Sequence, residues 1–282
     1  MPESPEVQAL VEDLGARLSG RRIADVDILE FRVAKTRARP PSSLVGEDIR
    51  GAARHGKHVD LLVGDSSHLI VSLGRHGWAR YADAGSAASP DPDSPPALVA
   101  FRFDDGTAIE FTDAGDWVSL GCYVVGQPAE VPAIAKLGAD PAAPGYFRED
   151  FDRVLTGRRK QVKAVLQEQE SLAGIGNAYS DEILHTAKIS PVVHAATLTP
   201  AQLERLFEAT VGVLSAAIDA RRGIPISDLK AAKVAAMRVH GKAGEACPVC
   251  GDTIREFSFA STTAEYCTTC QTDGQVLPLK SA

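Results

Sequence analysis

Four cysteines near the C-terminus constrain the fold of this chain more than any other feature. They form two Cys-x2-Cys pairs, Cys247 with Cys250 and Cys267 with Cys270, with sixteen residues between the pairs. Each pair places two thiolates on one turn, and two such turns can surround a tetrahedral zinc ion. The segment is too short to bury a core of its own, so the metal would hold it together. The spacing predicts one structural zinc; a redox pair and chance spacing are the alternatives.

Composition narrows the class of protein. The chain has 282 residues, of which 44% are hydrophobic, enough for two or three compact units. No run approaches the ~20 apolar residues of a membrane span, and residues 1–6 lack the basic and apolar regions of a secretion signal. We therefore expect a cytoplasmic protein without a membrane segment. In that compartment cysteines are metal ligands or free thiols, and Cys122, in an apolar stretch, is expected in the core.

The distribution of charge is more informative than its sum. The net charge of −7 argues mildly against a nucleic-acid partner. Basic residues nevertheless gather in three stretches, 32–57, 153–163 and 221–242. Any one stretch also fits a solvated protein face, but three beside the motifs described below favour nucleic acid.

Hydrophobic periodicity divides the chain into a β-rich part, a helical part and the cysteine-bearing part. Ser4 can cap a helix with Pro5 in its first turn, and Gly20 ends that helix. The alternation of strands then prevails to about residue 125. Strands are expected at 58–63, 68–73, 98–103 and 108–112, and a mobile loop at 82–96. Helices are expected at 147–155, 159–169, 177–187 and 200–221.

The N-terminus offers a nucleophile. Removal of the initiator methionine before Pro2 would expose a secondary amine, and because α-amino groups titrate near pH ~8, part of it is neutral at working pH. Such an amine condenses with an aldehyde to an iminium ion, the electron sink that β-elimination needs. Glu3 beside it can donate and accept protons. A Met-Pro-Glu start is common, however, and has no meaning by itself.

A glycine-containing turn precedes the helix expected at 177–187. Gly174 and Gly176 let backbone N–H groups approach a ligand, and Asn177 stands at the helix N-terminus, where the dipole suits a phosphate. In isolation the pattern also fits an ordinary helix-turn-helix with glycine caps.

Taken in chain order, these features resemble the formamidopyrimidine-DNA glycosylase/endonuclease VIII family over essentially the whole length. The matching residues are Pro2-Glu3-x-Pro5-Glu6, Gly56-Lys57, Leu73-Gly74-x-x-Gly77, Gly174-Ile-Gly176-Asn177-x-Tyr179-x-x-Glu182, and Val239-His240-Gly241-Lys242-x-Gly244-Glu245-x-Cys247 with the rest of the finger. The resemblance implies an α+β multidomain fold. Its parts would be an N-terminal β-sandwich with one N-terminal helix (1–130), a helix-two-turn-helix domain (131–236) and a zinc finger (237–282).

The resemblance also implies base-excision repair by a bifunctional DNA glycosylase and AP lyase that removes oxidised bases. Pro2 would attack C1′ of the damaged nucleotide, expel the base and form a Schiff base. Glu3 would handle protons at the sugar, Glu6 would help to shape the site, and Lys57 would bind a phosphate beside the lesion. The target nucleotide must leave the stack for this chemistry.

We expect a monomer, so its own side chains would make the contacts to DNA. Gly174, Gly176 and Asn177 would hold the backbone, and Arg75 and Lys242 are expected at the same interface.

Several departures from the family pattern bear on substrate. Arg75-His76 stands where relatives place an apolar wedge, and Asp113-Ala114-Gly115-Asp116-Trp117 lacks an arginine that fills the void left by an extruded base. Thr262 replaces a DNA-facing arginine of the finger, and 224–238 is too short for a loop that caps 8-oxoguanine. Because opening a duplex costs several kcal/mol, we expect a preference for single-stranded or unstacked damage.

An alternative is a catalytically weak protein of the same fold that binds DNA lesions or abasic sites. Retention of Pro2 with Glu3 favours the enzyme, whereas the altered loops favour the binding protein. An unrelated zinc-ribbon regulator would leave the N-terminal match unexplained.

Overall fold

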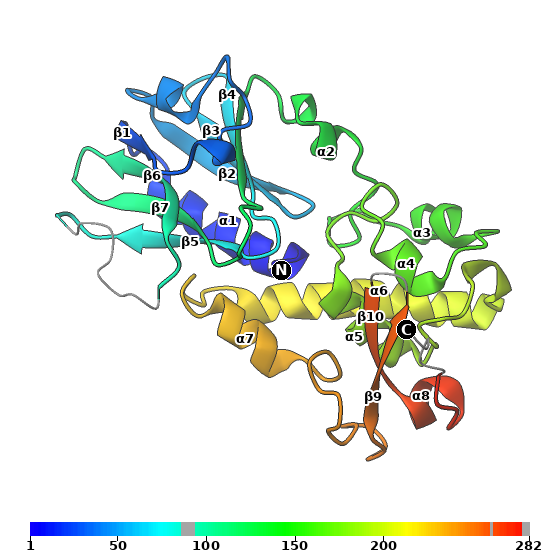
Figure 1. Cartoon of the computed structure of the whole chain (residues 1–282). Coiled ribbons are helices and arrows are strands. Elements are labelled where there is room, and N and C mark those ends of the chain that lie inside the picture. Colours follow the sequence, from blue (N-terminus) through cyan, green and yellow to red (C-terminus); the bar gives the residue numbers. More distant parts are fainter. Residues whose placement is uncertain (86–93, 260–261, 278–282) are drawn as a thin grey trace. The chain divides into compact units, whose positions relative to one another are not determined.

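The computed structural model describes residues 1–85, 94–259 and 262–277 (Figure 1). They form two compact units: the first contains residues 1–136 and 221–230, and the second 137–220 together with the chain from 231 onward. Most of the loop expected at 82–96 lies outside the described residues. Within them, no helix combines the length and apolarity that a membrane span requires. Three domains ending at 130, 236 and 282 stay a prediction.

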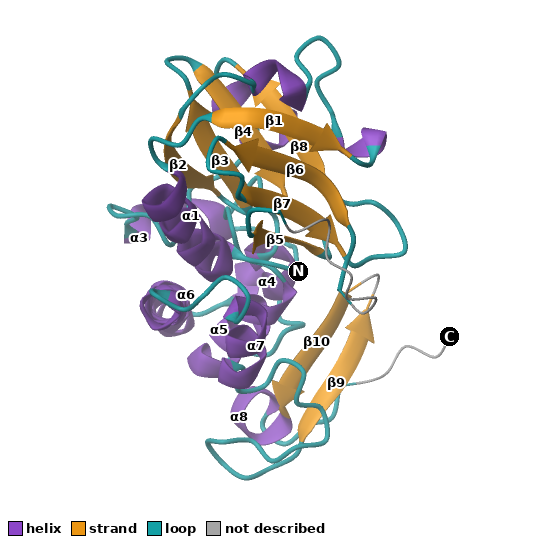
Figure 2. Ribbon diagram, turned by 90° about the vertical axis from the view of Figure 1, so that its left-hand side faces the viewer, coloured by secondary structure: helices purple, strands orange, loops and turns teal. Residues whose placement is uncertain are grey.

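The first unit is built on two four-stranded antiparallel sheets, with strand orders β1-β6-β7-β5 and β2-β3-β4-β8. Figure 2 shows them as two orange layers. The strands are β1 (Ile23–Ile28), β2 (Ile49–His55), β3 (His58–Val63), β4 (Ser67–Ser72), β5 (Gly77–Ala82), β6 (Ala97–Phe103), β7 (Ala108–Asp113) and β8 (Gly121–Val125). Alternate residues such as Val59, Leu61 and Val63 enter one shared core, so the predicted β-sandwich is confirmed.

Helix α1 contains residues Ser4–Leu18. It begins one residue earlier than predicted, because a helix capped by Ser4 would begin at Pro5. Glu3 is the N-cap, and its backbone N–H donates to the Glu6 carboxylate (3.2 Å) in a reciprocal capping box. The predicted Ser4 cap is wrong, because the carboxylates of Glu3 and Glu6 already accept the backbone N–H groups at the start of the helix. The Ser4 hydroxyl instead accepts from Arg54 (3.1 Å). Gly20, with φ of +83°, follows the end of the helix as expected.

Short elements complete this unit. They are η1 (Phe31–Val33), η2 (Pro41–Leu44), η3 (Pro128–Glu130) and α2 (Pro132–Ala135). The segment 221–230 also belongs here: Ile226 and Leu229 are buried in the sandwich core, and the Trp78 indole donates to the Ile226 carbonyl (2.7 Å). Cys122 is fully buried in β8, as expected, and burial raises the pKa of its thiol to about 12.

The second unit combines the helices with the cysteine-bearing segment. Its elements are α3 (Arg148–Leu155), α4 (Val162–Leu166), α5 (Asn177–Ala187), η4 (Ala195–Thr197), α6 (Pro200–Arg221), α7 (Leu229–Ala236), β9 (Ile254–Phe259), β10 (Thr262–Cys267) and α8 (Thr268–Thr272). Helices α6 and α7 reach the unit's boundaries at 220 and 231. The helices predicted at 147–155, 177–187 and 200–221 are confirmed within one residue.

The long basic helix predicted at 159–169 is wrong, since only Val162–Leu166 is helical. The carbonyls of Arg158 and Lys160 accept from the backbone N–H groups of Ala196 (2.8 Å) and Ala195 (3.0 Å). This pairing holds the preceding residues in an extended conformation. A partner more than thirty residues away therefore overrides the local helical pattern.

Candidate functional site

The N-terminus places two carboxylates in a dry environment beside Pro2. Pro2 is buried, and Glu3 and Glu6 are only 2% and 1% exposed. The Arg221 Nε lies 3.7 Å from the Glu6 carboxylate, and the Arg221 side chain is itself 3% exposed. This arginine offsets negative charge that burial would otherwise make costly. Water is thus largely excluded from the groups that would move protons at Pro2.

The β2–β3 turn brings Lys57 to the same end of the first unit. His55 pairs with His58, so Gly56 and Lys57 form the two-residue turn between them, with Gly56 at φ of +56°. The Arg54 guanidinium binds the Gly56 carbonyl (2.9 Å) and the Ser4 hydroxyl (3.1 Å). It thereby ties the lysine-bearing turn to the first turn of α1. The sequence showed Arg54 only as part of a basic stretch and not this role.

In the second unit, the turn predicted to bind a phosphate precedes α5, but the Gly174 N–H, which the sequence suggested could approach a ligand, is already bound within the chain. Gly174 adopts φ of +91°, and its N–H donates to Gln169 Oε1 (2.9 Å), which shapes the turn. Asn177 begins α5, and its side-chain oxygen accepts from Gln167 Nε2 (2.9 Å). The half-buried Asn177 amide is therefore held in one orientation at the helix N-terminus, where backbone N–H groups favour an anion.

The four finger cysteines converge as a zinc centre requires. Their sulfurs all lie within 4.8 Å of one another, with Cys250–Cys267 at 3.3 Å and Cys247–Cys270 at 3.9 Å. A tetrahedral site with Zn–S bonds of about 2.3 Å has sulfur–sulfur edges of about 3.8 Å, so these residues fit zinc. Burial raises the pKa of the Cys267 thiol to about 11, so a cation is needed before all four sulfurs can ionise.

Family models match three consecutive parts of the chain. The formamidopyrimidine-DNA glycosylase N-terminal domain matches residues 1–116, its H2TH domain 137–228, and the zinc finger found in FPG and IleRS 244–272. The formamidopyrimidine-DNA glycosylase of Symbiobacterium thermophilum is 33% identical over 286 residues, covering 96% of this chain and 89% of that protein. The chain belongs to the formamidopyrimidine-DNA glycosylase family. It is a zinc-finger DNA glycosylase of base-excision repair.

Two further relatives of this glycosylase differ in the length they share with it. A formamidopyrimidine-DNA glycosylase-like protein of Mycobacterium tuberculosis is 47% identical over 149 residues, which cover 53% of this chain and 93% of that protein. A complex between Lactococcus lactis Fpg and DNA containing an abasic site superposes with a TM-score of 0.83 at 25% identity. That match covers 96% of this chain and 99% of the Lactococcus chain.

The loops in which this glycosylase departs from the family pattern pack against each other. Asp113 accepts from Gly115 N–H (3.0 Å) and Ser119 N–H (2.8 Å), and the Ser119 hydroxyl accepts from the Arg75 N–H (3.0 Å). Burial opposes ionisation of Asp113, but these hydrogen bonds outweigh it and lower its pKa. In this arrangement Arg75 is exposed and Trp117 is 82% exposed.

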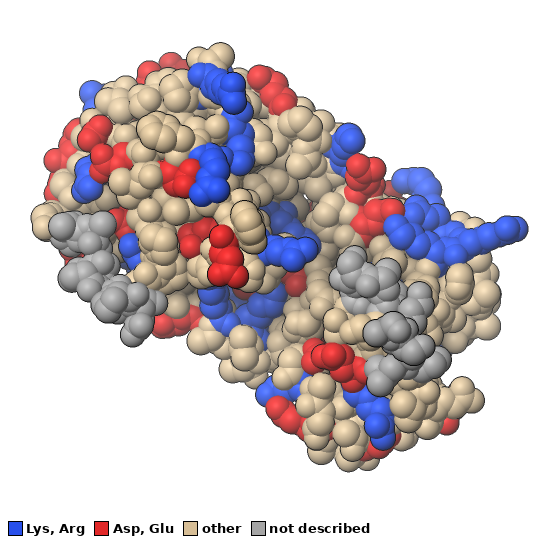
Figure 3. Space-filling view, in the orientation of Figure 1, with Lys and Arg blue, Asp and Glu red and all other residues tan. Residues whose placement is uncertain are grey.

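The basic stretch 153–163 is less available to DNA than the sequence suggested. Lys163 is fully buried and paired with Asp181, and Arg158 (2.5 Å) and Lys160 (2.7 Å) both bind Glu168. These contacts lower the pKa of Glu168 to about 2, chiefly through Lys160. In Figure 3, basic and acidic groups interleave over the first unit. The exposed face of the 153–163 stretch is therefore partly neutralised.

Two other positions that the sequence analysis singled out, 242 and 262, belong to the zinc-finger segment. Lys242 is half-buried beside Glu245, with 3.4 Å between Nζ and Oε1. Position 262 begins β10, but its side chain lies outside the described residues.

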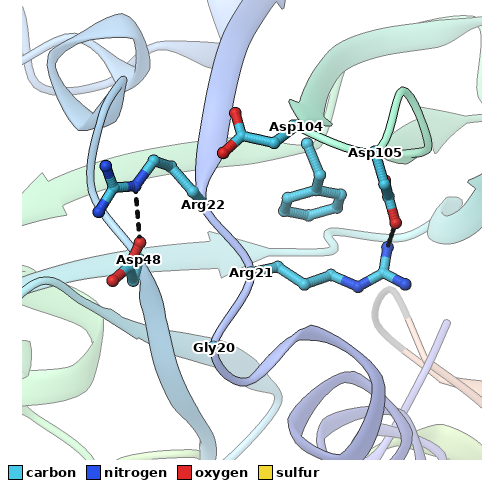
Figure 4. A pocket seen from close by; sticks show the side chains of 7 residues that line it. Gly20, Arg21, Arg22, Asp48, Asp104 and Asp105 are labelled. Carbon is cyan, nitrogen blue, oxygen red and sulfur yellow. Dashed lines mark hydrogen bonds and ion pairs between the residues drawn. The ribbon is translucent and has the colours of Figure 1, made fainter.

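An open pocket of about 420 Å³ lies at the opposite end of α1, around Gly20 and Phe103 (Figure 4). Its arginines are already paired, Arg22 with Asp48 (3.0 Å) and Arg21 with Asp105 (3.1 Å). Because a 15-residue helix spans about 22 Å, the pocket is remote from Pro2. It is not part of the candidate active site.

Proposed function

We propose that this glycosylase is bifunctional and that the Pro2 nitrogen is its nucleophile, with AP lyase activity following base removal. The observation that carries this proposal is the pair of buried carboxylates, Glu3 and Glu6, around an N-terminal proline. Methionine removal would expose a secondary amine there. The turn that carries Lys57, tied to the same helix end by Arg54, would supply a cation for a phosphate beside the lesion.

The chemistry follows from these groups. The Pro2 lone pair attacks C1′, the glycosidic bond breaks, and the departing base takes a proton from Glu3. Glu3 then takes the proton from the attached Pro2 nitrogen and passes it to O4′, which breaks the C1′–O4′ bond and opens the sugar to an iminium with Pro2. The iminium draws electrons from C2′, so loss of the C2′ proton expels the 3′ phosphate by β-elimination. Glu3 and Glu6, shielded from bulk water, would carry protons in these steps, and Arg221 would limit their mutual repulsion.

Borohydride trapping tests this proposal. Reduction of the iminium should leave a covalent adduct between an abasic oligonucleotide and the chain, and peptide mapping should locate it at Pro2. Intact mass should show that active protein lacks Met1. We expect Glu3→Gln to bind DNA without turnover, whereas Glu12→Gln, at an exposed position on the same helix, serves as the control. An adduct at a lysine, or active protein that retains Met1, would refute Pro2 as nucleophile. Binding without any adduct would favour a lesion-binding protein.

We further propose that unstacked or single-stranded damage is preferred over 8-oxoguanine in duplex DNA. Arg75 and His76 lie beside the loop that carries Trp117, since Gly115 packs against the His76 ring and the Ser119 hydroxyl accepts from the Arg75 N–H. A flat indole that is 82% exposed suits stacking on an unpaired base. Exposed Asp116 on the same loop would repel the phosphates of a continuous duplex.

Trp117→Ala tests the stacking contribution. Stacking of a base on an aromatic ring contributes about 1–3 kcal/mol, so affinity for a single-stranded abasic oligonucleotide should fall by roughly 5- to 150-fold. Phe31→Ala is a matched control, because Phe31 is also 82% exposed in the first unit. Single-turnover rates on matched oligonucleotides complete the test. Faster cleavage of duplex 8-oxoguanine than of every single-stranded substrate would contradict the proposed preference.

A further inference from the structure

Helix α5 presents one side to the segment that carries the zinc finger. Asp181 and His185 are four residues apart on α5, so they lie along one face, and Ile189 follows just after the helix ends at Ala187. Asp181 binds the His240 ring (2.8 Å), and the Ile189 carbonyl accepts from Gln271 Nε2 (2.9 Å). Between these two contacts, His185 Nε2 lies 3.3 Å from the sulfur of Cys247, one of the four zinc ligands.

The surroundings of His185 select one arrangement of its ring protons. The side chain is 3% exposed, and Nδ1 is buried without a hydrogen-bond partner among the residues that the structure describes. A zinc-bound cysteine is a thiolate, which only accepts. With its proton on Nδ1, the ring would turn a lone pair toward the thiolate and leave a buried donor unmatched. With its proton on Nε2, it donates to the thiolate, and only an acceptor stays unmatched.

We propose that His185 is an outer-sphere partner of the zinc centre, which donates its Nε2–H to the Cys247 thiolate and so orients and stabilises that ligand. A zinc ion with four thiolates carries a formal charge of −2, which a buried site tolerates only when hydrogen-bond donors offset it. The Val249 N–H, 3.5 Å from the same sulfur, is a second donor. Through His185, α5 thus reaches the Cys247 ligand with a side chain.

This contact has two consequences for the molecule. Outer-sphere hydrogen bonds hold metal ligands in position, and their loss typically lowers metal affinity by roughly 10- to 100-fold. Donation also withdraws electron density from the Cys247 sulfur, which makes that ligand less reactive toward oxidants and alkylating reagents. His185 is thus a positioning residue that couples the docking of the finger on α5 to the retention of zinc.

The experiment uses the full-length zinc protein and measures metal, not activity. Competition with a chelator gives the zinc dissociation constant of the wild type and of three variants. His185→Phe removes the donor and keeps a ring, and its dissociation constant should rise by roughly 10- to 100-fold. His185→Gln retains an N–H donor and should recover part of the affinity. His194→Phe, at an exposed histidine of the same unit, should match the wild type. Zinc affinity of His185→Phe equal to that of the wild type would overturn the proposal.

A second measurement needs no variant and decides the matter even where His185→Phe fails to fold. A long-range proton–nitrogen spectrum of the wild type shows which ring nitrogen of His185 carries the proton. With 113Cd in place of zinc, a scalar coupling between Hε2 and the metal through the sulfur is the expected signature. A proton on Nδ1, or direct coordination of Nε2 to the metal, would overturn the assignment.

Discussion

Replacement of Glu182 by glutamine tests how α5 holds the chain that enters the finger. Glu182 is 5% exposed, and its Oε1 accepts the backbone N–H groups of Arg238 (3.0 Å), Val239 (2.9 Å) and His240 (2.9 Å). Hydrogen bonds to a charged acceptor contribute about 1.5–3 kcal/mol each, against about 0.5–1.5 kcal/mol for neutral partners. Loss of the charge at three bonds therefore weakens this attachment by roughly 3 kcal/mol.

The assay is amide hydrogen exchange, which reports on each of these N–H groups separately. A loss of about 3 kcal/mol corresponds to exchange that is roughly 100-fold faster at Val239 and His240 if the segment opens locally. Glu208→Gln, at an exposed position on α6, is the control and should leave the exchange unchanged. Equal protection in Glu182→Gln and the wild type would refute the reasoning, because the N–H groups would then have other acceptors.

Three further predictions concern charge and metal. Lys57→Ala should weaken DNA binding and lower the slope of log affinity against log salt by roughly one unit, and an unchanged slope would exclude a phosphate contact. Metal analysis should find one zinc per chain, and its unaltered content in Cys250→Ser would argue against the four-cysteine site. Because the pKa of Glu168 falls from 4.5 to about 2, mainly through Lys160, its ionised form stabilises the protein above pH 4.5 and loses this effect as the pH falls toward 2. The difference in urea stability between the wild type and Glu168→Gln should shrink over that window, and a constant difference would disprove the assignment.

The loop that departs from the family pattern is held by hydrogen bonds that the sequence alone does not reveal. The loop after Asp113 lacks the arginine of the family pattern. The Asp113 carboxylate nevertheless accepts three backbone N–H groups, from Gly115, Ser119 and Leu120. These hydrogen bonds fix the backbone on either side of Trp117, whose side chain is exposed on the first unit. Loss of an arginine therefore does not mean loss of an ordered loop, and under the proposed preference stacking on Trp117 would replace the missing charge.

Features set by short-range spacing were predictable from the sequence. The two Cys-x2-Cys pairs, the alternation of β3 and the end of α1 before Gly20 each depend on residues a few positions apart. The Glu3 cap was missed because serine and glutamate compete for the same N–H groups within one turn, and only the folded helix shows that the Glu3–Glu6 pair wins. The prediction of a capped helix was therefore right, but the position of the cap was wrong by one residue.

The sequence by itself thus determined the family motifs, the order of the strand-rich and helical parts, and the zinc ligands, because each rests on local spacing. Tertiary structure alone decided which charges are available. Lys163 stands in a basic stretch that suggested a DNA contact, but Asp181, eighteen positions away, neutralises its charge inside the second unit. Trp78 likewise meets Ile226 across 148 positions. A side chain's partner depends on which distant segments pack together, and burial then decides whether its charge or hydrogen-bonding group meets solvent, DNA or another residue.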